Sequence, residues 1–166
     1  MIKAIVACDS NWAIGKDNDL LFHLQEDMKR FRVETKNSIV VCGYQTLLSF
    51  PDSKPLKGRS TICLCPPEIN RDDCFCVHSF EKCLQLVKEL SKTTTVWIIG
   101  GAMTYKSFLP YTDVVIVTKV NADGNGTVFF PNLDENPDFS PVYVSNTYKD
   151  GDHDISFWTY HRKNIM

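Results

Sequence analysis

The feature that most constrains the fold is a series of short apolar runs rich in β-branched residues. Those long enough to be strands are residues 2–8, 38–44, 60–65, 74–77, 94–99 and 113–120. Several of them are apolar without interruption, which is typical of strands that are covered on both faces. The runs therefore predict a parallel sheet buried between layers of helices.

Helical patterns separate these runs. The stretch 79–90 has Ser79 as its N-cap, and its apolar residues recur at helical spacing. Further helical stretches are 24–35 and 102–109, and a short one follows Gly43. Strands that alternate with helices form α/β sheets with right-handed crossovers.

The last part of the chain has a different pattern. Residues 140–148 and 154–163 alternate apolar and polar side chains on either side of "KDGDHD", which predicts a terminal antiparallel hairpin. We see no repeat, linker or low-complexity segment. The expected fold is a single α/β domain over residues 1–166. Its mostly parallel central sheet has about eight strands, ends in the C-terminal hairpin and is flanked by about four helices.

Composition and charge exclude several classes of protein. The 166 residues are 43% hydrophobic and 23% charged, with a formal net charge of −2. No basic stripe is available for nucleic acid. No stretch approaches the roughly 18 apolar residues of a membrane span, and the apolar N-terminus is too short for a signal peptide. We expect a cytoplasmic monomer that contacts neither nucleic acid nor membrane.

The chain has seven cysteines, which include two C-x-C pairs. Cys63 and Cys65 form one pair, Cys74 and Cys76 the other, and His78 follows. Structural zinc sites usually have two to four residues between paired cysteines, so the spacing argues against a metal site. An odd count without a secretory signal favours reduced thiols. No metal is expected, although a cysteine-rich metal-binding or redox protein without catalysis stays an alternative.

Two glycine turns are candidates for a phosphate-binding site. Gly100 and Gly101 follow the strand that begins near Val96, and Gly43 follows another strand, with Thr46 in the next helical turn. Glycine lets the backbone approach a ligand closely, and free N–H groups at a helix start can bind phosphate. Two such turns in one sheet fit a dinucleotide, although each could also be a plain tight turn.

The segment 9–22 has the features of a lid. It is polar at its start, contains Gly15 in its middle, and carries the apolar residues Trp12, Ile14 and Leu20. Loops of this length in compact domains are often functional, and apolar side chains on a loop need something to cover.

Asp27 interrupts the apolar face of the helix expected over 24–35. Leu24, Met28 and Phe31 lie on one face at i, i+4 and i+7, and Asp27 takes the i+3 position. It could simply be an acid near the positive end of the helix dipole. In an apolar cleft, however, a carboxylate needs a partner, and a planar ligand with two adjacent N–H donors would supply one.

Together these features resemble dihydrofolate reductase in its bacterial chromosomal form, over essentially the whole chain. The pieces that carry the resemblance follow the family's order: "AIGKDNDL", "FHLQEDMKRFRVET", "VVCGYQT", "PLKGR", "VWIIGGAMTY", "VTKV" and "FFP". The resemblance implies hydride transfer from NADPH to C6 of 7,8-dihydrofolate, which gives tetrahydrofolate for one-carbon metabolism. Antifolate-type molecules would be further ligands.

The resemblance also implies roles for single residues. Asp27 would bind the pterin and assist protonation of N5, with Leu20 and Phe22 of the lid as the other catalytic positions. Arg59 would bind the α-carboxylate of the glutamate tail. The implied substrate contacts are Ile5, Val6, Ala7, Asp27, Met28, Phe31, Leu56, Arg59, Ile99, Tyr105 and Thr118, the last a hydrogen-bond partner of Asp27. The implied cofactor contacts are Ala7, Ile14, Gly15, Asn18, Leu20, Gly43, Tyr44, Gln45, Thr46, Leu64, Cys65, His78, Ile99, Gly100, Gly101, Ala102, Met103 and Tyr105.

The sequence departs from the family pattern at the 2′-phosphate of NADPH. Tyr44 stands where Arg or Lys is usual, and Cys65 and Pro66 replace a hydroxyl residue and a polar or basic one. NADPH is still favoured, with Arg71 or His78 as substitute, and NADH stays open.

The lid departs from the pattern too. Leu21 and Phe22 stand for Pro and Trp, and Thr127 stands for the acid that faces the lid. The main alternative enzyme is a pyrimidinone reductase of riboflavin synthesis, which would need neither Asp27 nor Arg59.

Overall fold

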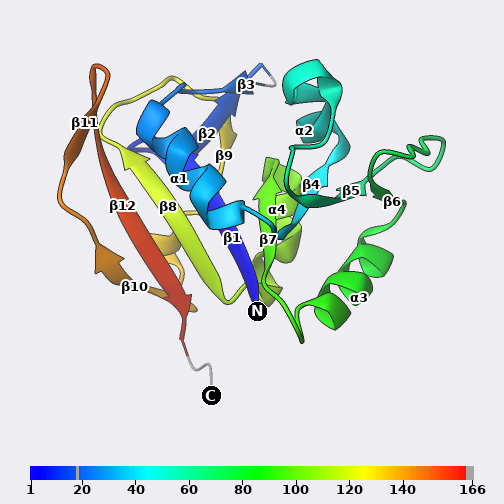
Figure 1. Ribbon diagram of the computed structural model, residues 1–166. Helices are drawn as coiled ribbons and strands as arrows, with labels where there is room; N and C mark the ends of the chain where they lie inside the picture. The colour runs from blue at the N-terminus through cyan, green and yellow to red at the C-terminus, as the bar shows by residue number, and fades with distance from the viewer. Residues whose placement is uncertain (18, 164–166) are drawn as a thin grey trace.

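The structure is a computed structural model, and it describes residues 1–17 and 19–163. The strands of its main sheet are β1 (Ile2–Cys8), β4 (Ile39–Gly43), β5 (Ser60–Leu64), β6 (Phe75–Val77), β7 (Val96–Gly100), β8 (Val114–Val120), β10 (Phe139–Val144), β11 (Tyr148–Asp150) and β12 (His153–Arg162). The strand order is β10-β12-β8-β1-β7-β4-β5-β6, and β11 pairs with β12 beside this path (Figure 1). The strands from β8 to β6 are parallel, as predicted.

Helices cover both faces of the sheet. They are α1 (Gln25–Thr35), α2 (Tyr44–Ser49), α3 (Phe80–Leu90) and α4 (Ala102–Phe108), with 3-10 turns at Pro51–Ser53, Leu109–Tyr111 and Leu133–Glu135. One core cluster joins α3 and α4 to one face of the sheet. A second cluster joins Phe31 of α1 and Leu47 of α2 to the other face. The expected α/β fold with about four helices is confirmed.

The apolar runs are continuous because both faces of the strands are covered. Val40, Val41 and Cys42 of β4 are all fully buried, although their side chains alternate between the two clusters. The same alternation in β1 sends Ile5 to the α1–α2 face and Val6 to the α3–α4 face. Burial on both faces is the environment that uninterrupted apolar strands predict.

The terminal hairpin is confirmed, with one added strand. β10 pairs antiparallel with β12, and β12 pairs antiparallel with β8. The first strand ends at Val144 instead of continuing to Tyr148, and the pairing shifts between Pro141 and Tyr143. β11 then pairs with β12 through a tight turn. β11 lies on the outer side of β12 (Figure 1), and its last residue, Asp150, accepts backbone N–H bonds from Gln25 and Glu26 of α1.

The segment expected to be a lid contains strands. β2 (Ala13–Lys16), β3 (Asp19–Leu20) and β9 (Val128–Phe129) form a small three-stranded sheet. Its base is tied by the buried Asp9, whose carboxylate accepts backbone N–H bonds from Asn11, Ala13 and Gly124 at 2.8–2.9 Å. The lid is therefore held at its base and not a free loop.

Local signals at the helix ends agree with the structure. The Ser79 hydroxyl accepts the backbone N–H of Lys82 at 3.2 Å, as expected of an N-cap. α4 ends at Phe108, and Pro110 lies in the 3-10 turn that follows. In the part of the chain that the structure describes, no helix is long and apolar enough to cross a membrane.

Candidate active site

Asp27 lies in the first turn of α1, half-buried against the sheet. Burial raises the pKa of its carboxyl above the usual value, because the ionised form loses solvent. A hydrogen bond with the side chain of Thr118, a buried residue of β8, opposes this rise, as does the positive charge of Arg30. The negative charge of Asp150 adds to the rise. The pKa of Asp27 is therefore set by burial together with Thr118, Arg30 and Asp150.

The apolar wall beside Asp27 is built by fewer helix residues than the sequence predicted. Phe31 packs with Leu56 against the cluster that contains Ile5 and Ile99. Met28 is 42% exposed. Leu24 was expected on the same wall, but it is the N-cap of α1 and is buried in a separate cluster with Val120 and Ile155.

Arg59 lies at the other end of α1 from Asp27. Its Nε donates to the Thr35 hydroxyl at 3.1 Å, its Nη1 donates to the Lys57 carbonyl at 2.9 Å, and its guanidinium lies 5.7 Å from the centre of the Phe31 ring. Asp27 and Thr35 are eight residues apart, which at 1.5 Å per residue is about 12 Å along the helix. An acid and a guanidinium thus lie at opposite ends of α1.

Burial and the charge of neighbouring Arg32 lower the pKa of Arg59, as expected where two cations lie close together.

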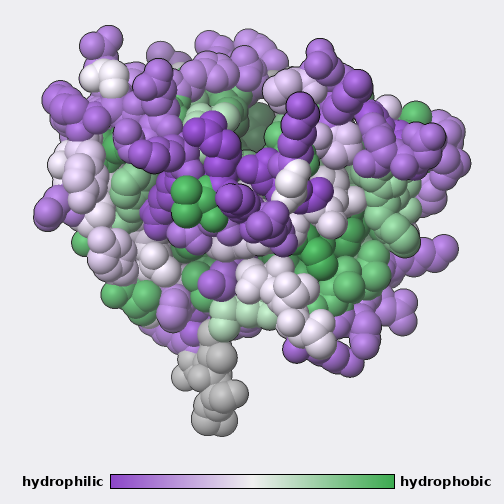
Figure 2. Space-filling model, viewed as in Figure 1, coloured by the Kyte–Doolittle hydropathy of each residue, from purple (hydrophilic) through white to green (hydrophobic). Residues whose placement is uncertain are grey.

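Figure 2 shows a recess with apolar residues at its bottom, between the segment that carries β3, the first turns of α1, and α2. The arrangement suits an elongated ligand with an N–H-rich ring and an anionic tail.

The two glycine turns face each other at the ends of β4 and β7. A Cβ atom on Gly43 would lie 3.0 Å from the Thr104 hydroxyl, and one on Gly101 would lie 3.2 Å from the Thr46 hydroxyl. Gly100 has φ of 130°, which side chains rarely adopt, and the Gly100–Gly101 peptide is cis. The turns leave backbone and two hydroxyls at a narrow crevice, which fits the cradle expected for a dinucleotide.

Tyr105 connects the crevice to β1. It is buried in α4, and its hydroxyl donates to the Ile5 carbonyl at 2.7 Å. Burial, and then the charge of Asp27, raise the pKa of Tyr105, so it stays neutral. Val6 packs on the opposite face of the sheet, so its backbone alone is available to the cleft, and Ala7 is half-buried.

Other expected cofactor residues lie around the crevice with different exposure. Ala102 is half-buried, while Met103 is 76% exposed and Gln45 is exposed. Leu64 is half-buried at the end of β5, and Cys65 is buried beside it.

The lid residues are placed by the small sheet. Ile14 packs against the main core, Gly15 pairs with Leu20, and Leu20 is 53% exposed. Phe22 meets the His153 ring edge-on at 4.7 Å and has no polar atom. Asn18 was also expected to bind the cofactor, but it lies outside the described residues.

The segment just before β9 fits closely against the segment expected to be a lid. The backbone N–H of Thr127 donates to the Gly15 carbonyl at 3.0 Å. A Cβ atom on Gly126 would lie only 2.6 Å from that of Ala13. A backbone hydrogen bond from Thr127 and the close packing of Gly126 therefore hold the lid at the place where the family pattern has an acid.

Arg71, one of the two residues expected to substitute for the usual phosphate-binding cation, is already paired. Arg71 donates to both carboxylate oxygens of Asp73 at 2.6–2.8 Å and to the Ser53 carbonyl at 2.7 Å, and its charge interacts with Tyr44. The hydrogen bond with Asp73 raises the pKa of Arg71. An open hollow of about 560 Å³ is lined by residues 70–73.

His78 lies near the same end of the cleft. Its ring nitrogens lie 3.0 Å from the Pro66 carbonyl and 3.0 Å from the Asn70 side-chain oxygen. Both ring nitrogens of His78 are therefore already in contact with oxygen atoms of the protein.

The cysteines are free thiols in the structure. Burial raises the pKa of Cys74 and of Cys83 to about 12, so neither is a thiolate at neutral pH. Across residues 1–17 and 19–163, no three His, Cys, Asp or Glu side chains are grouped to hold a metal ion.

Comparison with known proteins identifies the family. The model of the dihydrofolate reductase family matches residues 1–162. The chain belongs to the dihydrofolate reductase family. It is 32% identical over 167 residues to dihydrofolate reductase of Bacillus subtilis strain 168, covering 99% of this chain and 96% of the relative. It is 33% identical to the Staphylococcus haemolyticus enzyme over 97% of this chain and 95% of that one.

A solved structure agrees with these relatives. Dihydrofolate reductase from Enterococcus faecalis, complexed with NADP(H) and RAB-propyl, superposes with a TM-score of 0.86 at 28% identity, over 99% of this chain and 97% of that one. The expected enzyme class, an NADPH-dependent dihydrofolate reductase, is confirmed at the level of the family.

Sequence reasoning missed two charged residues next to Asp27. Arg30 was not singled out, and Asp150 appeared only within the turn "KDGDHD". Arg30 could have been found from its i+3 spacing to Asp27. No local signal marks Asp150, because it reaches α1 from more than a hundred residues away.

Proposed function

We propose that the protein reduces 7,8-dihydrofolate to tetrahydrofolate with NADPH, and that Asp27 binds the pterin edge and assists protonation of N5. The observation that carries this proposal is the setting of Asp27, a half-buried carboxyl with a raised pKa at an apolar wall. Such an acid holds a proton closer to neutral pH, where it can donate it. The paired N–H groups of a pterin edge would satisfy the carboxylate when it is ionised.

The rest of the cleft supports a substrate with a tail. Phe31, Leu56, Ile5 and Ile99 would contact the flat ring and the linker, and Arg59 would bind the tail carboxylate. Its bonds to Thr35 and Lys57 use Nε and Nη1, and Nη2 takes part in neither. Fixing the guanidinium in advance reduces the entropy lost on binding. The length of about 12 Å along α1 would leave room between the acid that binds the ring and the guanidinium that binds the tail.

The chain's own residues fit a nicotinamide dinucleotide. The close approach of Gly43 to Thr104 and of Gly101 to Thr46 leaves backbone and hydroxyl groups for its phosphates. NADPH, when bound, supplies the hydride. Tyr105 would fix the crevice through its bond to Ile5, and the lid would exclude water from the reacting atoms.

Arg71 is our candidate for the 2′-phosphate contact. Its guanidinium interacts with Tyr44 and is oriented by Asp73 and Ser53. The carboxylate of Asp73 partly neutralises it, so discrimination between NADPH and NADH would be weaker than with an unpaired cation. The Michaelis constants for the two cofactors test this, because equal values would reject the assignment.

The test of the function is direct. Purified protein is mixed with dihydrofolate and NADPH, and loss of the reduced nicotinamide absorbance is followed together with formation of tetrahydrofolate. Turnover that requires both substrates supports the proposal, and no turnover with either NADPH or NADH rejects it. Asp27→Asn serves as the matched variant, and a pyrimidinone of riboflavin synthesis as the competing substrate. The monomeric state stays a prediction, which sedimentation of the pure protein would check.

A further inference from the structure

Helix α1 begins without a cap of its own. Leu24 occupies the N-cap position and has no side-chain acceptor, although the first turn of a helix leaves four backbone N–H groups unpaired. The carboxylate of Asp150 supplies the acceptors. Its Oδ1 accepts the N–H of Gln25 at 3.1 Å, and its Oδ2 accepts the N–H of Glu26 at 2.8 Å. Asp150 is buried, with 7% of its surface exposed.

The turn between β11 and β12 holds this carboxylate in place. Asp150 pairs with His153 across the turn, and Lys149 pairs with Asp154 in the next position of the ladder. Gly151 has a φ of 61° at the first of the two turn positions, which is the residue that a type II′ turn requires. A two-residue turn of this kind permits little movement, so Asp150 reaches the helix from a fixed point.

The capped turn is the one that carries Asp27. By binding the two N–H groups just before it, Asp150 fixes the backbone from which the Asp27 side chain extends. Its negative charge also offsets the positive end of the helix dipole, which would otherwise favour the ionised form of Asp27. Both effects follow from the same two hydrogen bonds.

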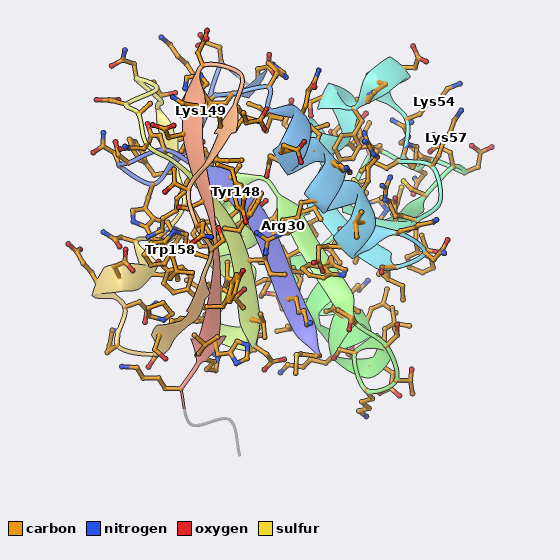
Figure 3. All side chains as sticks on the ribbon, turned by 60° about the vertical axis from the view of Figure 1, so that its left-hand side comes forward. Arg30, Lys54, Lys57, Tyr148, Lys149 and Trp158 are labelled. Atoms are coloured by element: carbon orange, nitrogen blue, oxygen red, sulfur yellow. The ribbon has the colours of Figure 1, made fainter. Side chains whose placement is uncertain are left out.

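Arg30 places an opposite charge one turn further along α1. Its guanidinium lies 4.3 Å from the centre of the Phe157 ring, between α1 and the terminal hairpin (Figure 3). Its Nη1 is buried and has no hydrogen-bond partner in the described part of the chain. The charge of Arg30 favours the ionised form of Asp27, whereas that of Asp150 disfavours it.

Other groups complete the surroundings of Asp27 and of Arg30. Thr118 of β8 and the buried Tyr105 of α4 interact with Asp27. Glu34 of α1 and Tyr143 of β10 interact with Arg30. Asp150 and Arg30 thus act on the pKa of Asp27 with opposite signs.

We propose that Asp150 is a positioning residue for Asp27, and that Asp150 and Arg30 together set the pH range in which Asp27 works. The inference rests on the proposed function for its link to turnover. Neither residue is assigned a contact with the substrate. The terminal hairpin therefore takes part in the active site through the backbone and the charge balance of α1.

Three variants test this proposal by the direction of their effects. Asp150→Asn keeps one acceptor and removes the charge, so the inflection in kcat/KM against pH that reports Asp27 should move to lower pH. Arg30→Gln removes the positive charge, so the same inflection should move to higher pH. Asp152→Asn is the matched control, because Asp152 lies in the same turn but is exposed. It should leave the inflection in place.

A second readout is independent of turnover. Asp27 is titrated by carbon NMR in the free protein labelled at aspartate carboxyls, with Asp27→Asn used to assign the signal. Its midpoint should fall in Asp150→Asn and rise in Arg30→Gln. This titration needs no substrate, so its result is valid even if the protein does not reduce dihydrofolate. A failure of the proposed function can therefore be distinguished from a failure of this inference.

Folding is monitored by thermal unfolding, and Asp150→Ser is a second neutral variant. If the titration midpoint of Asp27 is the same in the wild type, Asp150→Asn and Asp150→Ser, the inference is overturned. Shifts of the same sign in Asp150→Asn and Arg30→Gln also overturn it. Loss of the folded state in both Asp150 variants would make that residue purely structural and would overturn it as well.

Discussion

Replacing Asp27 by Asn should separate activity from stability. The amide has nearly the shape of the carboxyl and can still accept the Thr118 hydrogen bond, but it neither ionises nor donates an acidic proton. Positioned acid–base groups contribute about 10²–10⁴-fold, or about 3–5 kcal/mol at about 1.4 kcal/mol per tenfold. We expect turnover at neutral pH to fall within that range. The deficit should shrink at low pH, where dihydrofolate is already protonated.

Stability should change in the other direction. The pKa of Asp27 is raised in the folded protein, mainly by burial, so the folded state binds this proton more tightly than the unfolded chain does. The stabilising contribution is fully present below the unfolded value near 3.8 and is lost as the pH rises through the folded pKa. At neutral pH the wild type therefore carries the cost of a half-buried charge. Asp27→Asn removes that cost, so its midpoint of thermal unfolding should equal or exceed that of the wild type.

Two measurements check this prediction on the same samples. Single-turnover kinetics with NADPH give the rate of hydride transfer, and thermal unfolding across acid and neutral pH gives the stability difference. The difference in stability should disappear in acid, where the wild-type carboxyl is also neutral. Unchanged turnover at neutral pH would refute the catalytic role. A strong loss of stability at neutral pH would instead make Asp27 part of the structural core.

Three other substitutions test separate parts of the cleft. Arg59→Ala should weaken binding of substrates that carry the glutamate tail by about 10- to 100-fold, since charged hydrogen bonds contribute about 1.5–3 kcal/mol, and an equal loss with simple pterins would reject the tail contact. Arg71→Ala should raise KM for NADPH more than for NADH. Lys92→Ala, in the exposed turn after α3, should change neither KM. Gly126→Ala should cost about 1–3 kcal/mol, because its Cβ would lie 2.6 Å from that of Ala13. Gly124→Ala is the control for this last change, since its Cβ would meet only the ends of side chains, and an equal loss of stability in both would contradict the close fit.

Much of the fold could be predicted from the sequence because the main sheet is buried on both faces. An uninterrupted run such as Val40–Cys42 has few other environments available to it in a chain of mixed charge. Ser79 predicted the start of its helix because an N-cap bond is made within three residues. Such signals depend only on residues close together in the sequence, and the structure agrees with them.

The lid shows where local patterns stop being sufficient. Residues 13–16 pair with the nearby β3 on one side, but their other partner is β9, more than a hundred residues later. Gly126 has no pattern of its own that would indicate the tight approach to Ala13. The segment was therefore predicted as a loop, which was wrong for its backbone, whereas its function as a lid stays a prediction.

The candidate site divides in the same way. Asp27 could be found because it breaks an apolar stripe on one helix, and Arg59 because it lies in a motif of the family. Leu24 was misplaced, since the helix boundary and the cluster under the hairpin decide which way it faces. Asp150 could not be found, because the α1 cap depends on a contact between the two ends of the chain.

The external cap on α1 also bears on how the protein is made. The helix is synthesised early, but the carboxylate that caps it lies 124 and 125 residues downstream of the two N–H groups it binds. A chain emerging from the ribosome therefore exposes the acid-bearing helix long before its cap exists. Contacts this distant in sequence also form slowly, because a large loop must close first. The binding cleft should consequently be among the last parts of the molecule to take its working shape, and fragments that stop before β11 should lack it.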